Sequence, residues 1–407
     1  MFKIPRGTIN HKINDEIKNL LKSIFYNLNS QKIVNKFEQK FASYNERKFC
    51  CAFPFARTAF YYSIKSLGIR KGSEIIMSPI TIKAILDVVL ELGLKPIFCD
   101  LNPDTLCYDE IQLQKKIKQK TKLIIITYLF GMVPNLQIYL ELQKKGIFII
   151  EDFSQCLNGK FKNKYVGTFG DISIYSSSSI KTLDTYGGGL AITDKEKFYL
   201  SLKEDQKKLG PPSRIFLIKK IIINLIRNIL TSKYIFSFFS YYLILILNSN
   251  SKNTKMLGDR SINPIKSLPK SWFQKYTSVQ AEVGLAKINQ VRREDKKRID
   301  IAEKIKNLSS SNLISFPKGN NFCSNVYWQL LFYTNNREKI RNYFYKKGID
   351  TTSTSLEKVC SLKNYGYNFI LPNVEKIYNQ SLFFPCFSKM DNKQKNKAYM
   401  TIKELVK

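Results

Sequence analysis

Histidine is almost absent from this 407-residue chain, which contains only His11. A serine–histidine–aspartate hydrolase needs a histidine as its general base, and His11 would have to be that base. It stands in a polar N-terminal segment, where we expect it to lie at the surface. We therefore set this class of hydrolase aside.

Metal-type or disulfide-type cysteine spacing is also missing. The eight cysteines are scattered, and Cys50 and Cys51 are adjacent, which suits neither a tetrahedral metal site nor an ordinary bridge. The first six residues lack the apolar core of a signal peptide. We expect no metal site and a reducing, cytoplasmic location.

Acidic residues are scarce: 32 Asp and Glu stand against 66 Lys and Arg, a formal net charge of +34. A coding bias toward Lys, Asn and Ile would explain many lysines but not the two-to-one excess of bases over acids. A positive surface attracts polyanions such as nucleotide sugars, anionic lipid or nucleic acid. Because no nucleic-acid-binding motif is present, we expect no nucleic acid partner.

What the chain does contain is a series of short apolar runs between residues 56 and 200. They are bounded by polar segments and separated by amphipathic stretches, and the clearest are residues 73–77, 95–100, 123–128 and 146–151. Such runs are typical of strands buried on both faces. The pattern predicts an α/β fold with a mostly parallel sheet sandwiched by helices, and catalytic groups at the carboxyl ends of the strands.

One lysine stands out against this background. Lys181 closes the hydroxyl-rich run Tyr175–Lys181 and precedes three glycines, and Asp152 ends an apolar strand about thirty residues upstream. A pyridoxal 5'-phosphate (PLP) enzyme needs these groups: an amine to bind the cofactor covalently, hydroxyls for its phosphate and a carboxylate for its pyridine nitrogen. We predict these roles for Lys181, Ser176 and Asp152. The alternatives are a plain serine-rich loop and a helix cap.

The order of these motifs resembles the DegT/DnrJ/EryC1/StrS family of sugar aminotransferases, which have the aspartate aminotransferase fold. The resemblance covers nearly the whole chain except an insertion near 206–258 and is looser after residue 320. It is carried by residues 56–59, 78–81, 96–100, 129–131, 151–155, 166–171, 175–181 and 280–285, and more weakly by 326–330 and 381–385.

The resemblance implies a PLP-dependent transaminase. The amino group would move from glutamate to a nucleotide-linked keto-sugar, for surface polysaccharide synthesis. It also implies a homodimer with shared active sites, and Gln155 beside the cofactor ring. Thr58 and the backbone amide of Ala59 open a predicted helix, whose N-terminus favours a phosphate. Arg57 replaces the usual glycine and would either add charge there or point outward.

Several residues depart from the family pattern. Ile82 replaces a ring-stacking aromatic residue, Gly187 a common Glu, and Phe273 and Lys275 replace Asn and Arg, of which the Asn reaches the neighbouring subunit's phosphate. The sugar-binding His-Tyr-Pro pattern is absent, and residues 351–355 read Thr-Thr-Ser-Thr-Ser. Two rivals follow: other PLP chemistry such as dehydration, whose family members carry His at the lysine position, and a membrane-peripheral member with weak catalysis.

For the domain organisation we expect an N-terminal arm (1–45), a large PLP-binding domain (46–275), and a linking helix over about 278–310 followed by a small α+β domain (276–407). The insertion at 206–258 contains nine Lys or Arg and no acid. A polar stripe runs from Lys220 to Thr231, and the charge-free run Tyr234–Leu247 is shorter than the roughly 20 residues of a transmembrane helix. Residues 214–247 would either lie in a membrane interface or pack on protein.

Overall fold

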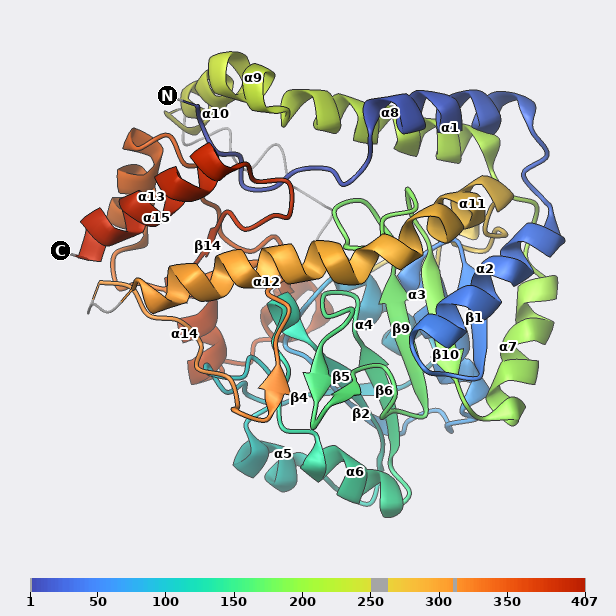
Figure 1. The fold of residues 1–407 in the computed structure, drawn as a ribbon. Coiled ribbons are helices and arrows are strands. Elements are labelled where there is room, and N and C mark those ends of the chain that lie inside the picture. Colours follow the sequence, from blue (N-terminus) through green and yellow to red (C-terminus); the bar gives the residue numbers. More distant parts are fainter. Residues whose placement is uncertain (1, 250–262, 310–312, 407) are drawn as a thin grey trace.

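The computed structural model describes residues 2–249, 263–309 and 313–406. A seven-stranded sheet has the order β1-β10-β9-β6-β5-β2-β4 (Figure 1). Its strands are β1 (Phe49–Phe53), β2 (Glu74–Met77), β4 (Lys95–Phe98), β5 (Thr121–Thr127), β6 (Phe148–Asp152), β9 (Ile172–Ser176) and β10 (Gly189–Thr193). The pairs β2/β4, β2/β5, β5/β6 and β6/β9 are parallel, whereas β10 is antiparallel to both β9 and β1. The prediction of a mostly parallel sheet is confirmed.

Helices cover this sheet because its strands are apolar on both faces. They are α2 (Gln31–Tyr44), α3 (Ala56–Ser66), α4 (Lys83–Glu91), α5 (Glu110–Lys116), α6 (Gln137–Lys144) and α7 (Glu196–Lys207). Helices α2 and α7 contact β1, and α3 contacts β10 and β9. One large hydrophobic core joins the sheet to the helices and includes the centres of β5 and β6.

The predicted helix over 278–310 is two helices. A capping box at Thr277 and Gln280 starts α11 (Ser278–Lys287), a 3₁₀ turn follows at Ile288–Gln290, and α12 (Val291–Asn307) continues nearly in line (Figure 1). Beyond it lies an α+β unit in which β12 (Leu330–Tyr333) pairs antiparallel with β14 (Ser381–Phe384). Its helices are α13 (Arg337–Lys346), α14 (Pro372–Gln380) and α15 (Asn392–Val406).

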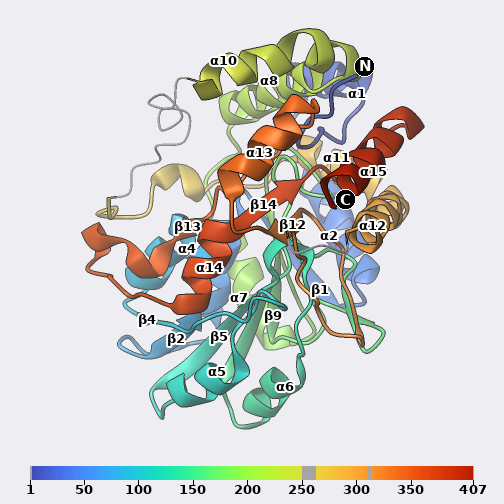
Figure 2. The same cartoon turned by 90° about the vertical axis from the view of Figure 1, so that its left-hand side faces the viewer.

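The insertion forms α8 (Arg214–Leu230), the short α9 (Lys233–Ile235), a π-helical turn at Phe236–Ser240 and α10 (Tyr241–Ser249). Its last part, 250–258, lies outside the described residues. Helix α8 packs along α1 (Ile13–Phe25) at the end of the molecule remote from α5 and α6 (Figures 1 and 2). Within the described residues no single helix is long and apolar enough to cross a membrane, but the bent pair Arg214–Leu230 and Lys233–Ile246 passes on length and composition.

Candidate active site

Two adjacent acids end strand β6, and the alternation of a strand sends their side chains to opposite faces. The Glu151 carboxylate is buried and accepts five hydrogen bonds, from the Tyr128 hydroxyl, the Ser173 hydroxyl and three backbone amides between residues 167 and 170. A carboxylate with that many donors has a structural role. Asp152, by contrast, accepts from the backbone amide of Ser154 at 3.1 Å and keeps acceptor capacity for a ligand.

The structure brings Lys181 and Asp152 together. Burial lowers the pKa of the Lys181 amine to about 8, and the nearby Asp152 carboxylate partly opposes that shift. Burial likewise raises the pKa of Asp152, against hydrogen bonds from Ser154 and the charge of Lys181. Although Lys181 as a whole residue is only partly buried, its amine is the enclosed part. The carboxyl ends of β6 and β9 therefore hold the predicted acid–amine pair.

A tryptophan that the sequence analysis did not single out covers this amine. The Lys181 Nζ lies 3.9 Å from the centroid of the Trp328 ring, and the Trp328 Nε1–H donates to the Ile180 carbonyl at 3.0 Å. Ile180 has φ +70°, a left-handed conformation that is uncommon for a β-branched residue. Backbone strain of this kind gathers at functional sites, where the surrounding contacts hold it.

The loop that carries Lys181 is held at both ends. On the β10 side, the Ser177 amide donates to the Gly188 carbonyl at 3.1 Å, and the Thr185 and Tyr276 hydroxyls are 2.7 Å apart. A Cβ on Gly188 would come within 2.6 Å of both the Tyr276 ring and the Ser177 hydroxyl, so only glycine fits there. The glycines after Lys181 thus serve close packing of the loop.

On its other side the loop joins a buried polar network, again one that the sequence did not reveal. Asn224 of α8 accepts from the Ser179 hydroxyl at 2.5 Å and donates to Asp184 at 3.0 Å. His11 Nε2 lies 3.2 Å from the same Asp184 carboxylate, and the His11 ring stacks on Tyr186. Burial would raise the pKa of Asp184, but His11 holds it below its usual value. The prediction that His11 lies at the surface is wrong, because it is 5% exposed.

The remaining predicted cofactor residues occupy the same edge of the sheet but are partly engaged. The Ser176 hydroxyl donates to Ser178 at 3.1 Å. Gln155 accepts from the backbone amide of Phe130 at 2.7 Å. The Thr58 hydroxyl donates to the Trp272 carbonyl at 2.7 Å, and the Ala59 amide donates to the Phe55 carbonyl at 3.1 Å. Phosphate binding by these last two groups requires those bonds to break, and their role stays a prediction.

Arg57 packs against aromatic side chains of its own subunit. Its guanidinium lies between two aromatic rings, 3.9 Å from the Phe55 centroid and 4.2 Å from that of Trp272. Phe273 packs edge-on against Tyr61 and Tyr62 of α3. The segment around residue 273 therefore covers the start of α3 in its own subunit.

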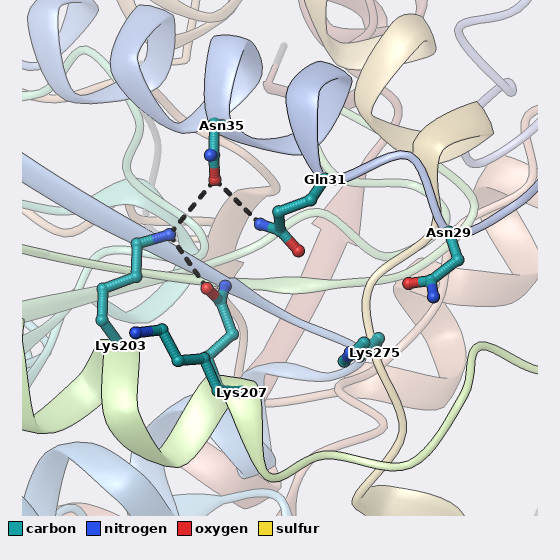
Figure 3. Close-up of a pocket in the computed structure, with 7 residues that line it drawn as sticks. Asn29, Gln31, Asn35, Lys203, Lys207 and Lys275 are labelled. Atoms are coloured by element: carbon teal, nitrogen blue, oxygen red, sulfur yellow. Dashed lines mark hydrogen bonds between the residues drawn. The ribbon is translucent and has the colours of Figure 1, made fainter.

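A cavity of about 330 Å³ lies outside this site (Figure 3). None of the predicted cofactor residues lines it; its walls are Asn29, Gln31, Asn35, Lys203, Gln206, Lys207 and Lys275. Lys203 ion-pairs with Glu38 and donates to Gln206 at 2.9 Å. It also donates to Asn35 at 3.5 Å, as a dashed line in Figure 3 shows. The cavity is basic, and it contains Lys275, which stands where the family often has an arginine.

Known proteins agree with this architecture. Residues 8–204 match the model of the DegT/DnrJ/EryC1/StrS aminotransferase family. GDP-perosamine synthase of Escherichia coli O157:H7 is 34% identical over 167 residues, covering 41% of this chain and 46% of that protein. The spore coat polysaccharide biosynthesis protein SpsC of Bacillus subtilis is 28% identical over 165 residues, covering 40% and 42%. The chain thus spans less than half the length of these curated relatives.

At the level of fold the likeness extends over the whole chain. The structure of Helicobacter pylori PseC, an aminotransferase involved in the biosynthesis of pseudoaminic acid, superposes with a TM-score of 0.74 at 18% identity, covering 100% of this chain and 98% of that one. The sheet, with its lysine and acid at the carboxyl ends, therefore defines an α/β protein of the PLP-dependent transferase fold. More narrowly, residues 8–204, just under half of the chain, are similar to the DegT/DnrJ/EryC1/StrS aminotransferase family.

Proposed function

We propose that this protein is a PLP-dependent aminotransferase that moves an amino group from an amino-acid donor, glutamate in the first instance, to a nucleotide-linked keto-sugar. The observation that carries the proposal is the pairing of Lys181, whose pKa is lowered to about 8, with Asp152 at the carboxyl edge of a parallel sheet. Perturbed titratable groups that share one buried site are a mark of catalysis.

The residues at this edge fit the cofactor in chemical terms. Lys181 provides an amine that is partly neutral near neutral pH, which covalent attachment of an aldehyde requires. Asp152 keeps acceptor capacity, which suits a protonated pyridine nitrogen. The Ser176 and Ser178 hydroxyls are the donors at the end of β9 that suit the phosphate. When bound, the cofactor supplies an electron-withdrawing ring that stabilises negative charge on the substrate carbon.

This chain's own part in the reaction is proton transfer and enclosure. With the cofactor bound, Lys181 would act as a base whose pKa lies near the working pH, where a general acid–base is most effective. Asp152 would provide negative charge for the pyridine nitrogen. Trp328 lies over the Lys181 amine and excludes water from it on that side.

The substrate class rests on the relatives and on charge. GDP-perosamine synthase and a spore coat polysaccharide biosynthesis protein are among the similar sequences, so we assign a keto-sugar and a role in surface polysaccharide synthesis. A net charge of +34 favours an anionic carrier such as a nucleoside diphosphate. On the same grounds we propose a cytoplasmic location, where nucleotide sugars are available to the enzyme.

The proposal also includes a homodimer and a division of the chain into three regions. Lys275 lines the basic cavity in Figure 3 together with Lys207, at the place where family members reach toward a partner's phosphate. The regions are the arm 1–45, the large domain 46–275 and the segment 276–407 with its small domain. Sedimentation of the purified protein at micromolar concentration should show a dimer, and an active monomer under those conditions would contradict it.

The function is tested by a half-reaction. Protein loaded with the aminated form of the cofactor is mixed with a panel of nucleotide-linked keto-sugars, and mass spectrometry follows the aminated sugar while absorbance follows the cofactor. Conversion of at least one keto-sugar supports the proposal. Covalent cofactor binding through Lys181 without turnover of any sugar or amino-acid donor would instead favour the rival, a family member with other chemistry or weak catalysis. The observation that favours this rival is the hydrogen bond from the Thr58 hydroxyl to the Trp272 carbonyl, which occupies a predicted phosphate donor.

A further inference from the structure

The outer helix layer is our name for α1 together with α8 and residues 233–246. Helices α1 and α8 run antiparallel: Arg214 at the start of α8 donates to the carbonyls of Ile24 and Tyr26 at the end of α1, at 2.7 and 2.9 Å. At the other end, Asn228 donates to Glu16 at 2.8 Å. The layer forms one face of the molecule, with α1 and α8 side by side in both views (Figures 1 and 2).

This layer buries several polar side chains and exposes many apolar ones. The buried positions include Glu16, Ser23, Asn224 and Asn228, with Asn224 at 0% exposure. Of the 27 large apolar side chains exposed in the described part of the chain, 17 belong to residues 13–26 and 214–246. They include Ile13, Ile17, Leu21, Ile24, Phe25, Ile215, Ile222, Ile226, Phe238, Phe239, Tyr242 and Ile246. Exposed apolar residues scattered singly are ordinary, whereas this concentration marks an interaction surface.

The polar stripe from Lys220 to Thr231 lies partly inside the protein. Two of its members, Asn224 and Asn228, bind Asp184, His11 and Glu16 there. Three apolar residues of α8, Ile215, Ile222 and Ile226, are exposed instead.

Charge decides what covers this surface. No acid occurs between residues 206 and 246, while Lys219 and Arg227 of α8 are exposed. At the start of α1, the N-cap residue Lys12 and Lys18 are exposed, against one exposed acid, Asp15. A second copy of the chain meeting this face about a twofold axis would bring the same cationic helices together. A bilayer with anionic headgroups provides both the apolar phase and the opposite charge.

We propose that the outer helix layer docks the protein on an anionic lipid surface, with its apolar side chains in the acyl boundary and Lys219 and Arg227 at the headgroups. The charge-free run from Tyr234 adds aromatic residues, which favour that boundary. The bend of 61° between α8 and the following helix keeps the pair from crossing as one straight span. Docking needs no turnover, so its test is independent of the proposed activity.

Flotation of the full-length protein on density gradients tests this directly. The protein should float with vesicles of phosphatidylglycerol and phosphatidylcholine and at least tenfold less with vesicles of phosphatidylcholine alone. The paired change Ile226→Glu and Phe239→Glu, at side chains 50% and 59% exposed, should lower binding to the anionic vesicles at least tenfold. The matched control is Ile111→Glu with Ile370→Glu, 66% and 77% exposed on other elements, which should float like the wild type.

A second variant covers the case in which the paired change fails to fold. Lys219→Glu with Arg227→Glu alters only exposed charges, and it should weaken binding to anionic vesicles at least threefold. If the wild type ignores anionic vesicles, or if the control pair loses as much binding as the test pair, the proposal is overturned. Sedimentation adds a further arm: a wild type that does not float and that becomes monomeric on the Ile226 and Phe239 changes would identify the layer as a contact between copies.

Discussion

The carboxyl edge of the sheet and the outer helix layer bury opposite kinds of side chain. In β6 and β9 the isoleucines are inside, and the functional polar groups, Asp152 and the Lys181 loop, follow where the strands end. In the outer layer Asn224 and Glu16 are inside, whereas most of the large apolar residues, including Ile17, Ile222 and Ile226, are exposed. The comparison teaches that periodicity finds the apolar face of an element but does not say whether that face meets protein.

The two regions are joined, since Asn224 of the outer layer holds Ser179 and Asp184 on either side of Lys181. Changes at the sheet edge should therefore affect chemistry alone, changes to the buried side of the layer should affect both folding and loading of the cofactor, and changes to its outer side should affect attachment alone.

Lys181→Ala should have the largest effect. Because the amine is both the covalent anchor and the base, the variant should lose the absorbance of bound cofactor and roughly 10⁴-fold or more of its transamination rate. Flotation and thermal stability should stay close to those of the wild type. Lys164→Ala, at an exposed lysine, is the control. A borohydride-reducible adduct on another lysine of the Lys181 variant would show that the anchor is misassigned.

Asp152→Asn should come next. The amide cannot keep negative charge beside the ring nitrogen, so the variant should bind cofactor but transfer protons about 10²-fold more slowly, the typical scale for a positioned acid–base or electrostatic partner. Single-turnover kinetics with an amino-acid donor measure this step. Rates like those of the wild type would mean that Asp152 only caps the end of β6.

Asn224→Ala tests the link between the regions. It leaves Ser179 and the buried Asp184 each without one partner, which should lower the free energy of unfolding by about 2–3 kcal/mol and weaken cofactor retention. Ile226→Ala, two residues further along α8 and half exposed, should change stability by no more than about 0.5 kcal/mol. Urea unfolding and cofactor dialysis measure the two quantities. Equal effects from both variants would break the distinction between the two sides of α8.

The rate at which the apo-protein covalently captures added cofactor should rise with pH, because the neutral amine of Lys181 is the reactive form. Its pKa is lowered to about 8, so the neutral, reactive fraction grows from roughly a tenth at pH 7 to a half at pH 8. The initial rate of covalent capture should rise about fivefold over that interval and level off above roughly pH 9. Stopped-flow absorbance follows it. A rate that still climbs steeply beyond pH 10 would indicate an amine with an ordinary lysine pKa.

The residues at the carboxyl edge of the sheet could be predicted from the sequence because the signals for them are local. The apolar runs at 123–128 and 146–151 predicted β5 and β6, and the rule that ligands meet parallel strands at their carboxyl ends brought Asp152 and Lys181 together. What the sequence could not reveal depends on contacts between distant segments. His11 is buried beside Asp184, the Thr58 hydroxyl donates to the Trp272 carbonyl, and polar residues of α8 pack on α1, about two hundred residues away. The break after Lys287 lacks a Gly or Pro that could have marked it.

Ile222→Gln should have the smallest effect and sharpens the comparison most. The side chain is 40% exposed on the outer side of α8, and glutamine is at least as good a helix former as the β-branched isoleucine. In solution the free energy of unfolding should therefore change by no more than about 0.5 kcal/mol. Ile221→Gln, one position earlier on the buried side at 0% exposure, should destabilise by several times as much, since it places an amide in an apolar environment. Urea unfolding of the two variants in parallel, without lipid, gives the answer. A loss of 2 kcal/mol or more from Ile222→Gln would mean that the outer side of α8 is covered by protein in solution, and the contrast between the two regions would then disappear.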